Sequence, residues 1–115
     1  MLPRYLRLRR PQDFRAVQRD GQRWSGEHLV LSKLPNGRDH NRYGFVVSKQ
    51  VGNAVTRNLV KRRLRALVSS SLTYHPPGLD IVLIARKSSA SASYEGLGKD
   101  FSSLENRADI ARQLL

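Results

Sequence analysis

The sequence predicts an α+β fold in which helices pack against one β-sheet. Two apolar segments flank a turn signal at Pro35-Asn36-Gly37, which is typical of neighbouring strands. A long helical segment then ends at His75-Pro76-Pro77-Gly78. A further apolar segment and an amphipathic segment complete the chain. Strands and helices that mix in this way over 115 residues indicate one domain, residues 1–115.

The first half of the chain predicts a short helix and two or three strands. Pro11 suits the first position of a helix, and Gly21 suits its end. We expect strands over residues 28–34 and 42–48, and their spacing suits a hairpin with a loose loop. Residues 22–26 can add a short strand before this pair.

The second half predicts a helix, a strand and a helix. Thr56 is a reasonable N-cap for a helix that runs to about Leu72. Residues 79–85 are apolar and rich in β-branched side chains, as in a strand that is buried on both faces. The last helix has one apolar stripe. The stripe contains Leu97, Phe101, Leu104, Ala108 and Ala111.

The charge of the chain is strongly positive and unevenly distributed. Lysine and arginine total 21 against 9 acidic residues, and 16 of the basic but only 4 of the acidic residues lie in residues 1–65. Such an excess indicates a surface that binds a polyanion. The absence of cysteine excludes disulfides and thiol catalysis, and fits a cytoplasmic protein. No apolar segment is long enough to cross a membrane, and we expect no secretory signal.

The segment from residue 57 to residue 68 predicts a helix with a cationic face. On a helical wheel, Val60, Leu64 and Leu67 form the buried stripe. Arg63 falls at the edge of the buried arc. The face beside the stripe contains Arg57, Asn58, Lys61, Arg62 and Arg65. Because these like charges repel one another along the helix, a nucleic-acid backbone is the natural counter-charge, and a solvated basic face is the alternative.

The pattern G-N-A-V-x-R-N-x-x-K-R-x-x-R, from Gly52 to Arg65, resembles the signature of the ribonuclease P protein family. Similar residues extend over most of the chain: Arg7-Leu8, Asp13-Phe14, the segment 46–49 and the segment 84–87. The resemblance implies the order α-β-β-β-α-β-α, as a two-layer sandwich with helices packed on a four-stranded sheet. It also implies an endoribonuclease in which RNA is the catalyst and the protein alone is inactive.

The activity that the resemblance implies is the hydrolytic removal of the 5′ leader from precursor tRNA. The implied partners are the ribonuclease P catalytic RNA and that leader, without a membrane or a small-molecule substrate. Magnesium would be held mainly by the RNA. No residue of the protein is implied to be catalytic or to bind metal.

The resemblance also assigns residues to two binding surfaces. The residues implied to bind the catalytic RNA are Arg57, Asn58, Lys61, Arg62 and Arg65. The residues implied to form the leader-binding cleft are Phe14, Val17, Gln18, Lys49 and Arg86. Gln18 and Ser32 stand where members of the family have aromatic residues, so we expect less base stacking in this cleft.

Two other functions compete with this interpretation. The first is a binding module, such as a ribosome-associated protein, that shares only the basic helix. The second is a nuclease that acts without RNA. The sequence disfavours the nuclease because its carboxylates are not paired, and because His28, His40 and His75 are isolated from one another.

Overall fold

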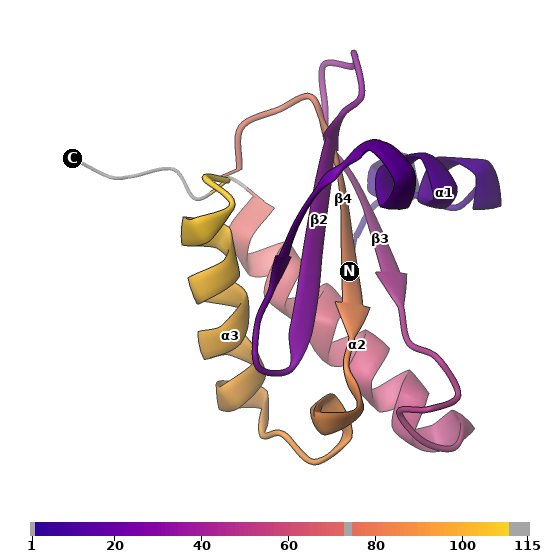
Figure 1. Cartoon of the computed structure of the whole chain (residues 1–115), viewed down its shortest axis with the longest axis vertical. Coiled ribbons are helices and arrows are strands. Elements are labelled where there is room, and N and C mark those ends of the chain that lie inside the picture. Colours follow the sequence, from indigo (N-terminus) through magenta and orange to yellow (C-terminus); the bar gives the residue numbers. More distant parts are fainter. Residues whose placement is uncertain (1, 73–74, 111–115) are drawn as a thin grey trace.

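The computed structural model describes residues 2–72 and 75–110. It contains three α-helices, four strands and two short 3-10 helices in this part of the chain (Figure 1). The helices are α1 (Pro11–Asp20), α2 (Ala54–Ser71) and α3 (Tyr94–Arg107), with η1 (Arg4–Leu6) and η3 (Lys87–Ala90) as the 3-10 helices. The strands are β1 (Gln22–Ser25), β2 (Leu29–Pro35), β3 (Arg42–Val46) and β4 (Leu79–Ala85). The α+β class and the order of the elements are confirmed.

The four strands form one mixed sheet in the order β1-β2-β4-β3. Strand β4 pairs antiparallel with β2 and parallel with β3, so the predicted hairpin between β2 and β3 is wrong. β4 lies between them because its apolar side chains can be buried on both faces of the sheet. The chain therefore leaves β3, crosses the sheet as α2 and returns as β4.

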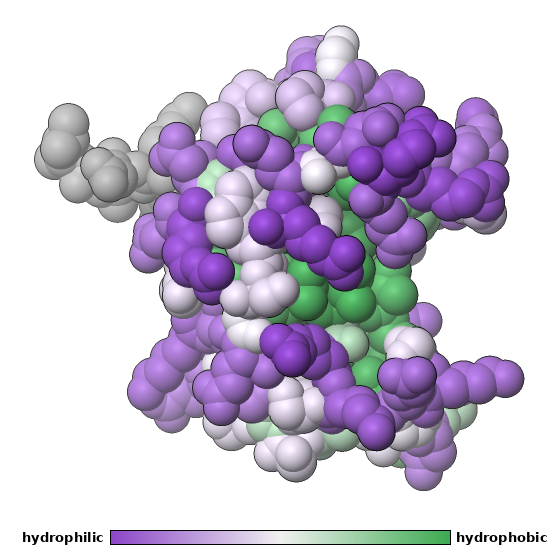
Figure 2. All heavy atoms as spheres, viewed as in Figure 1, coloured by the Kyte–Doolittle hydropathy of each residue, from purple (hydrophilic) through white to green (hydrophobic). Residues whose placement is uncertain are grey.

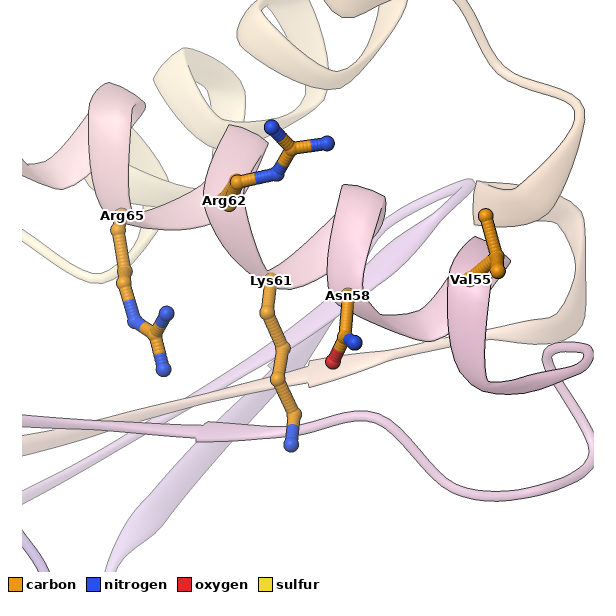
Figure 3. Close-up of a pocket in the computed structure, with 5 residues that line it drawn as sticks. All are labelled: Val55, Asn58, Lys61, Arg62 and Arg65. Carbon is orange, nitrogen blue, oxygen red and sulfur yellow. The ribbon is translucent and has the colours of Figure 1, made fainter.

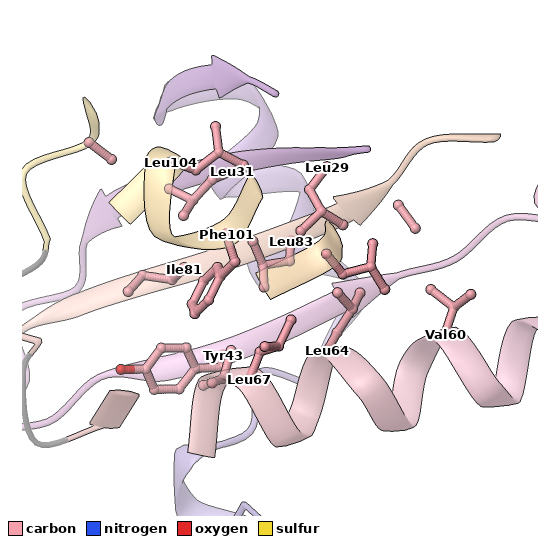
Figure 4. Close-up of a cluster of buried hydrophobic side chains, with 14 of the residues drawn as sticks. Leu29, Leu31, Tyr43, Val60, Leu64, Leu67, Ile81, Leu83, Phe101 and Leu104 are labelled. Atoms are coloured by element: carbon pink, nitrogen blue, oxygen red, sulfur yellow. The ribbon is translucent and has the colours of Figure 1, made fainter. Parts of the chain in front are cut away.

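Helices cover both faces of the sheet, and α1 adds a partial third layer to the expected sandwich. Helices α2 and α3 pack on one face around Leu31, Leu64, Leu83 and Phe101 (Figure 4). On the other face, a smaller core surrounds Val17 of α1. The smaller core contains Leu8, Val17 and Val82, with Phe14, Leu34, Val46 and Ile84 packed against it. Because α1 has only ten residues, it covers only part of its face.

Helix α2 begins three residues earlier than predicted. Asn53, and not Thr56, is the N-cap, and its side-chain oxygen accepts a hydrogen bond of 2.9 Å from the Thr56 backbone amide. Asn and Thr are both good caps, so the sequence pattern did not separate them. Val60, Leu64 and Leu67 are buried as the wheel predicted. In the last helix, the stripe is buried from Leu97 to Ala108, and Ala111 lies outside the described residues.

A buried polar network joins His75, which lies between α2 and β4, to β3 and α3. The His75 ring contacts the Tyr43 hydroxyl at 2.8 Å and the Glu105 carboxylate at 2.5 Å. All three residues are buried, and burial raises the pKa of the Tyr43 phenol. These partners satisfy both ring nitrogens, so His75 has a structural role in the core.

None of the described helices is long and apolar enough to cross a membrane.

The position of α1 depends on a glycine in β3. A Cβ atom at Gly44 would lie 2.5 Å from the nearest carbon of the Phe14 ring. We expect Gly44→Ala to lower the free energy of unfolding by about 1–3 kcal/mol, because the ring must move out of its place on the sheet. Urea unfolding measures this change.

The matched control is Gly98→Ala in α3, where the added Cβ would lie 3.4 Å from its nearest neighbour, a methyl carbon of Leu67. Alanine is favoured over glycine inside a helix by about 0.8–1.0 kcal/mol, so this variant should be at least as stable as the parent chain. Equal stability of the two variants would show that Phe14 does not press on β3.

Candidate nucleic-acid interface

The cationic face of α2 forms a shallow hollow on the surface of the protein. Val55, Asn58, Lys61, Arg62 and Arg65 line it, and four of these five residues were predicted from the sequence. Figure 3 shows that the side chains of Asn58, Lys61 and Arg65 point to the same side of the helix, whereas Arg62 points away from them. The structure thus brings most of the predicted set together on one surface.

The remaining arginines of α2 lie outside this hollow. Arg57 is half-buried near the start of the helix and is not part of the lining. Arg63 donates a hydrogen bond of 3.1 Å to the carbonyl of Ala92, in the loop before α3. This contact agrees with the predicted position of Arg63 at the edge of the buried arc. Val55 was not predicted, although its exposed fraction of 78% makes it the most exposed large apolar side chain described.

The cations on this face have no acidic partners in the part of the chain that the structure describes. Among the described residues, no carboxylate forms an ion pair with Arg57, Lys61, Arg62 or Arg65. The ion pairs of the structure lie elsewhere, and most of them are local. An external anion can therefore supply a counter-charge that the described residues do not provide.

A second surface lies on the opposite face of the sheet, in the part that α1 does not cover. Val30, Ile84 and Val46 are aligned across β2, β4 and β3, and Ile84 and Val46 keep part of their surface exposed. Figure 2 shows an apolar hollow on this face, with hydrophilic surface above and below it. Half-buried Phe14 and exposed Gln18 come from α1, which borders this face. An apolar floor with polar edges suits bases on the floor and phosphates at the edges.

The two predicted cations of the cleft lie beyond the carboxyl ends of parallel strands. Lys49 follows β3 and Arg86 follows β4, so they lie at the same edge of the sheet, away from Phe14 at the middle of β3. Arg86 donates a hydrogen bond of 2.9 Å to the carbonyl of Gly26, which fixes its position. The predicted cleft residues therefore border one face at two separate places.

Val17 cannot contact a ligand in this cleft. Its side chain is fully buried against Leu8 and Val82, between α1 and the sheet. The spacing of three residues predicted that Val17 and Phe14 share a helix face. It could not show that Val17 is fully buried in the core, whereas Phe14 is only half-buried. Ser32 is also buried, so the residue that replaces an aromatic there presents almost no surface.

Arg42 was not predicted and anchors α1 to the sheet. Its guanidinium donates two hydrogen bonds to the buried Asp80 carboxylate, at 2.9 and 2.7 Å, and one of 3.4 Å to Asp13 of α1. The hydrogen bonds to Asp80 raise the pKa of Arg42. No local pattern links residues 13, 42 and 80, because sheet pairing brings them together.

In the described residues, no three His, Asp or Glu side chains form a group that could hold a metal ion.

Comparison with known proteins places the chain in a family. A sequence model of the family described as Ribonuclease P matches residues 2–109. The chain belongs to the ribonuclease P protein family. The family supplies the protein component of a ribonucleoprotein that processes tRNA, which agrees with the resemblance found in the sequence.

Relatives in this family match the chain over most of its length. The ribonuclease P protein component of Syntrophomonas wolfei is 37% identical over 96% of this chain and 92% of its own. That of Acidothermus cellulolyticus is 42% identical, over 93% and 91%.

Solved structures of ribonuclease P proteins have the same fold. The Thermotoga maritima protein has a TM-score of 0.80 and 30% identity, over 88% of this chain and 96% of its own. The Staphylococcus aureus protein has a TM-score of 0.87 and 26% identity, over 93% and 98%.

Proposed function

We propose that the chain binds two RNAs in ribonuclease P: the catalytic RNA on α2 and the 5′ leader of precursor tRNA on the opposite face of the sheet. In this role the protein assists the hydrolytic removal of the leader, and the RNA carries the catalysis. The observation that carries the proposal is the cationic face of α2, which has no acidic partner among the described residues. The family membership gives that face its partner.

Contact with the catalytic RNA is proposed for Arg57, Asn58, Lys61, Arg62 and Arg65. Lys61 and Arg65 lie one helical turn apart, about 6 Å along the axis, which is close to the spacing of phosphates along one strand. The arginines can bind phosphate oxygens through two parallel hydrogen bonds. Asn58 adds an acceptor among side chains that only donate. Together these properties suit an RNA backbone with some contact to ribose or base.

Contact with the leader is proposed for Phe14, Gln18, Lys49 and Arg86. The apolar row of Val30, Ile84 and Val46 provides a floor for bases, and Phe14 provides one aromatic ring. We expect Lys49 and Arg86 to bind phosphates beyond the carboxyl ends of β3 and β4. Gln18 can form a hydrogen bond with a base edge. Val17 supports this surface from the core and does not contact RNA.

Magnesium is proposed to be bound mainly by the RNA of the complex. There it would activate the attacking water and stabilise the leaving oxygen. The residues of this chain bind and orient RNA in the proposal, and none of them moves a proton or forms a bond.

The contribution of α2 can be measured from the salt dependence of binding. We expect Arg57→Ala and Arg65→Ala each to flatten the plot of log affinity for the catalytic RNA against log salt by about 0.9, because each removes one phosphate contact. Arg63→Ala should flatten it less, since Arg63 contacts the Ala92 carbonyl. The measurement is a binding titration of each variant between about 50 and 200 mM salt.

Three outcomes of that titration are informative. Equal slopes for the Arg63 and Arg65 variants would show that the assigned face is wrong. An unchanged slope in every variant would show that α2 does not meet RNA phosphates. A flattened slope for Arg57 and Arg65 alone supports the assignment.

The leader surface can be tested at Phe14. We expect Phe14→Leu to weaken binding of precursor tRNA to the assembled complex and to leave binding of mature tRNA nearly unchanged, because only the precursor carries a leader. Stacking of one base is worth about 1–3 kcal/mol, and the low end, roughly fivefold, is expected with a single ring. Leucine keeps an apolar side chain in the smaller core, and equal losses for both RNAs would assign Phe14 to packing alone.

The assignment of catalysis to RNA can be tested by reconstitution. We expect the protein alone to leave precursor tRNA intact, and the protein with the catalytic RNA to cleave it at low magnesium. The assay compares protein, RNA and the complex. Magnesium-dependent cleavage by RNA-free protein, abolished by a point mutation in the chain, would refute the proposal.

A further inference from the structure

A small hollow of about 180 Å³ lies at the outer edge of β3, between the N-terminal segment (residues 2–10) and α2. Two arginines of the N-terminal segment, Arg7 and Arg9, lie on one side of it, and Lys61 and Arg65 of α2 lie on the other. Phe14 and Phe45 contribute aromatic wall. The hollow shares Lys61 and Arg65 with the α2 face and Phe14 with the leader surface, so it lies where the two proposed RNA surfaces meet.

The pairing of the N-terminal segment with β3 explains why these cations converge. The Leu8 amide donates a hydrogen bond of 2.8 Å to the Tyr43 carbonyl, and Arg7 forms a parallel bridge with the same residue. Side chains alternate in an extended segment. Because Leu8 is buried against Val82 on the α1 face, its neighbours Arg7 and Arg9 point toward the face that α2 covers.

The four cations have no acidic partner among the described residues. No described carboxylate forms an ion pair with Arg7, Arg9, Lys61 or Arg65. Arg7 is held in place by a hydrogen bond of 3.0 Å from its Nε to the Leu2 carbonyl. Like charges that converge around so small a space repel one another, and an anion between them removes that repulsion.

The shape and the walls of the hollow narrow the choice of anion. Its volume lies below the range of about 300–1,000 Å³ that is usual for pockets that bind drug-sized ligands, so it accepts one phosphate with a neighbouring group. The rings of Phe14 and Phe45 offer that group an apolar surface, as nucleic-acid-binding proteins do for bases. A base paired in a duplex cannot reach such rings, whereas an unpaired nucleotide can.

We propose that this hollow binds one unpaired nucleotide of RNA. The phosphate lies between Arg7 and Arg9 on one side and Lys61 and Arg65 on the other, and the base or ribose contacts the phenylalanine rings. The inference rests on the proposed function, because it takes the ligand to be RNA, and it adds the N-terminal arginines to the residues that bind it.

The first test measures binding of uridine 5′-monophosphate to the full chain by calorimetry or NMR titration. We expect Arg9→Gln to raise the dissociation constant about tenfold, the size of one lost hydrogen bond to a charged group. The matched control is Arg10→Gln, which removes the same charge from an exposed neighbour that does not line the hollow. It should leave the dissociation constant nearly unchanged.

Ribose 5-phosphate is the second ligand in this test. Tighter binding of uridine 5′-monophosphate than of ribose 5-phosphate supports contact between the base and the rings. Equal affinity for the two ligands would overturn the nucleotide assignment. Equal losses in the Arg9 and Arg10 variants would overturn the site, since the effect would then be one of net charge.

The second test identifies the RNA that supplies the nucleotide. Weaker binding of precursor tRNA, but not of mature tRNA, by the complex that contains Arg9→Gln identifies the leader. Weaker binding of that variant to the catalytic RNA identifies the catalytic RNA instead. If Arg9→Gln changes neither while Arg57→Ala weakens binding to the catalytic RNA, the inference fails and the proposed function stands.

Discussion

The burial of β4 between β2 and β3 determines the arrangement of the other elements. β4 is the most apolar strand and pairs on both edges, antiparallel with β2 and parallel with β3. A parallel pair requires a crossover connection, and α2 is that connection. The cationic helix is therefore fixed to the sheet along its apolar stripe, and its charged side chains must face outward.

The same sheet separates two surfaces of different character. α2 and α3 seal the larger core on one face, whereas the ten-residue α1 covers only part of the other. Arg42 holds α1 in place through Asp13 and Asp80, and Gly44 lets the Phe14 ring lie close to β3. The partly exposed apolar row beside α1 is thus a consequence of a short helix that is held at one end of the sheet.

The acidic residues that stabilise the fold are also separate from the basic residues of α2. The acidic residues near the core have structural partners: Asp80 binds Arg42, Glu105 binds His75, and Asp100 accepts three backbone amides at the β1–β2 turn. None of them neutralises α2. The unpaired positive charge is concentrated on α2 and on the N-terminal segment beside β3. This arrangement is expected of a surface that binds a polyanion.

The sequence by itself determined the class of fold, the identity of the elements and the cationic face. These depend on local periodicity, since a helix repeats every 3.6 residues and a strand every two. It also determined the family, because the motif from Gly52 to Arg65 is a long run of fixed spacings. Tertiary structure alone decided that β4 separates β2 from β3, that Val17 is sealed, and that Arg7 and Arg9 meet Lys61 and Arg65. Those outcomes depend on which strands pair and which faces are covered, and such contacts join residues too far apart in the chain for any local pattern to record them.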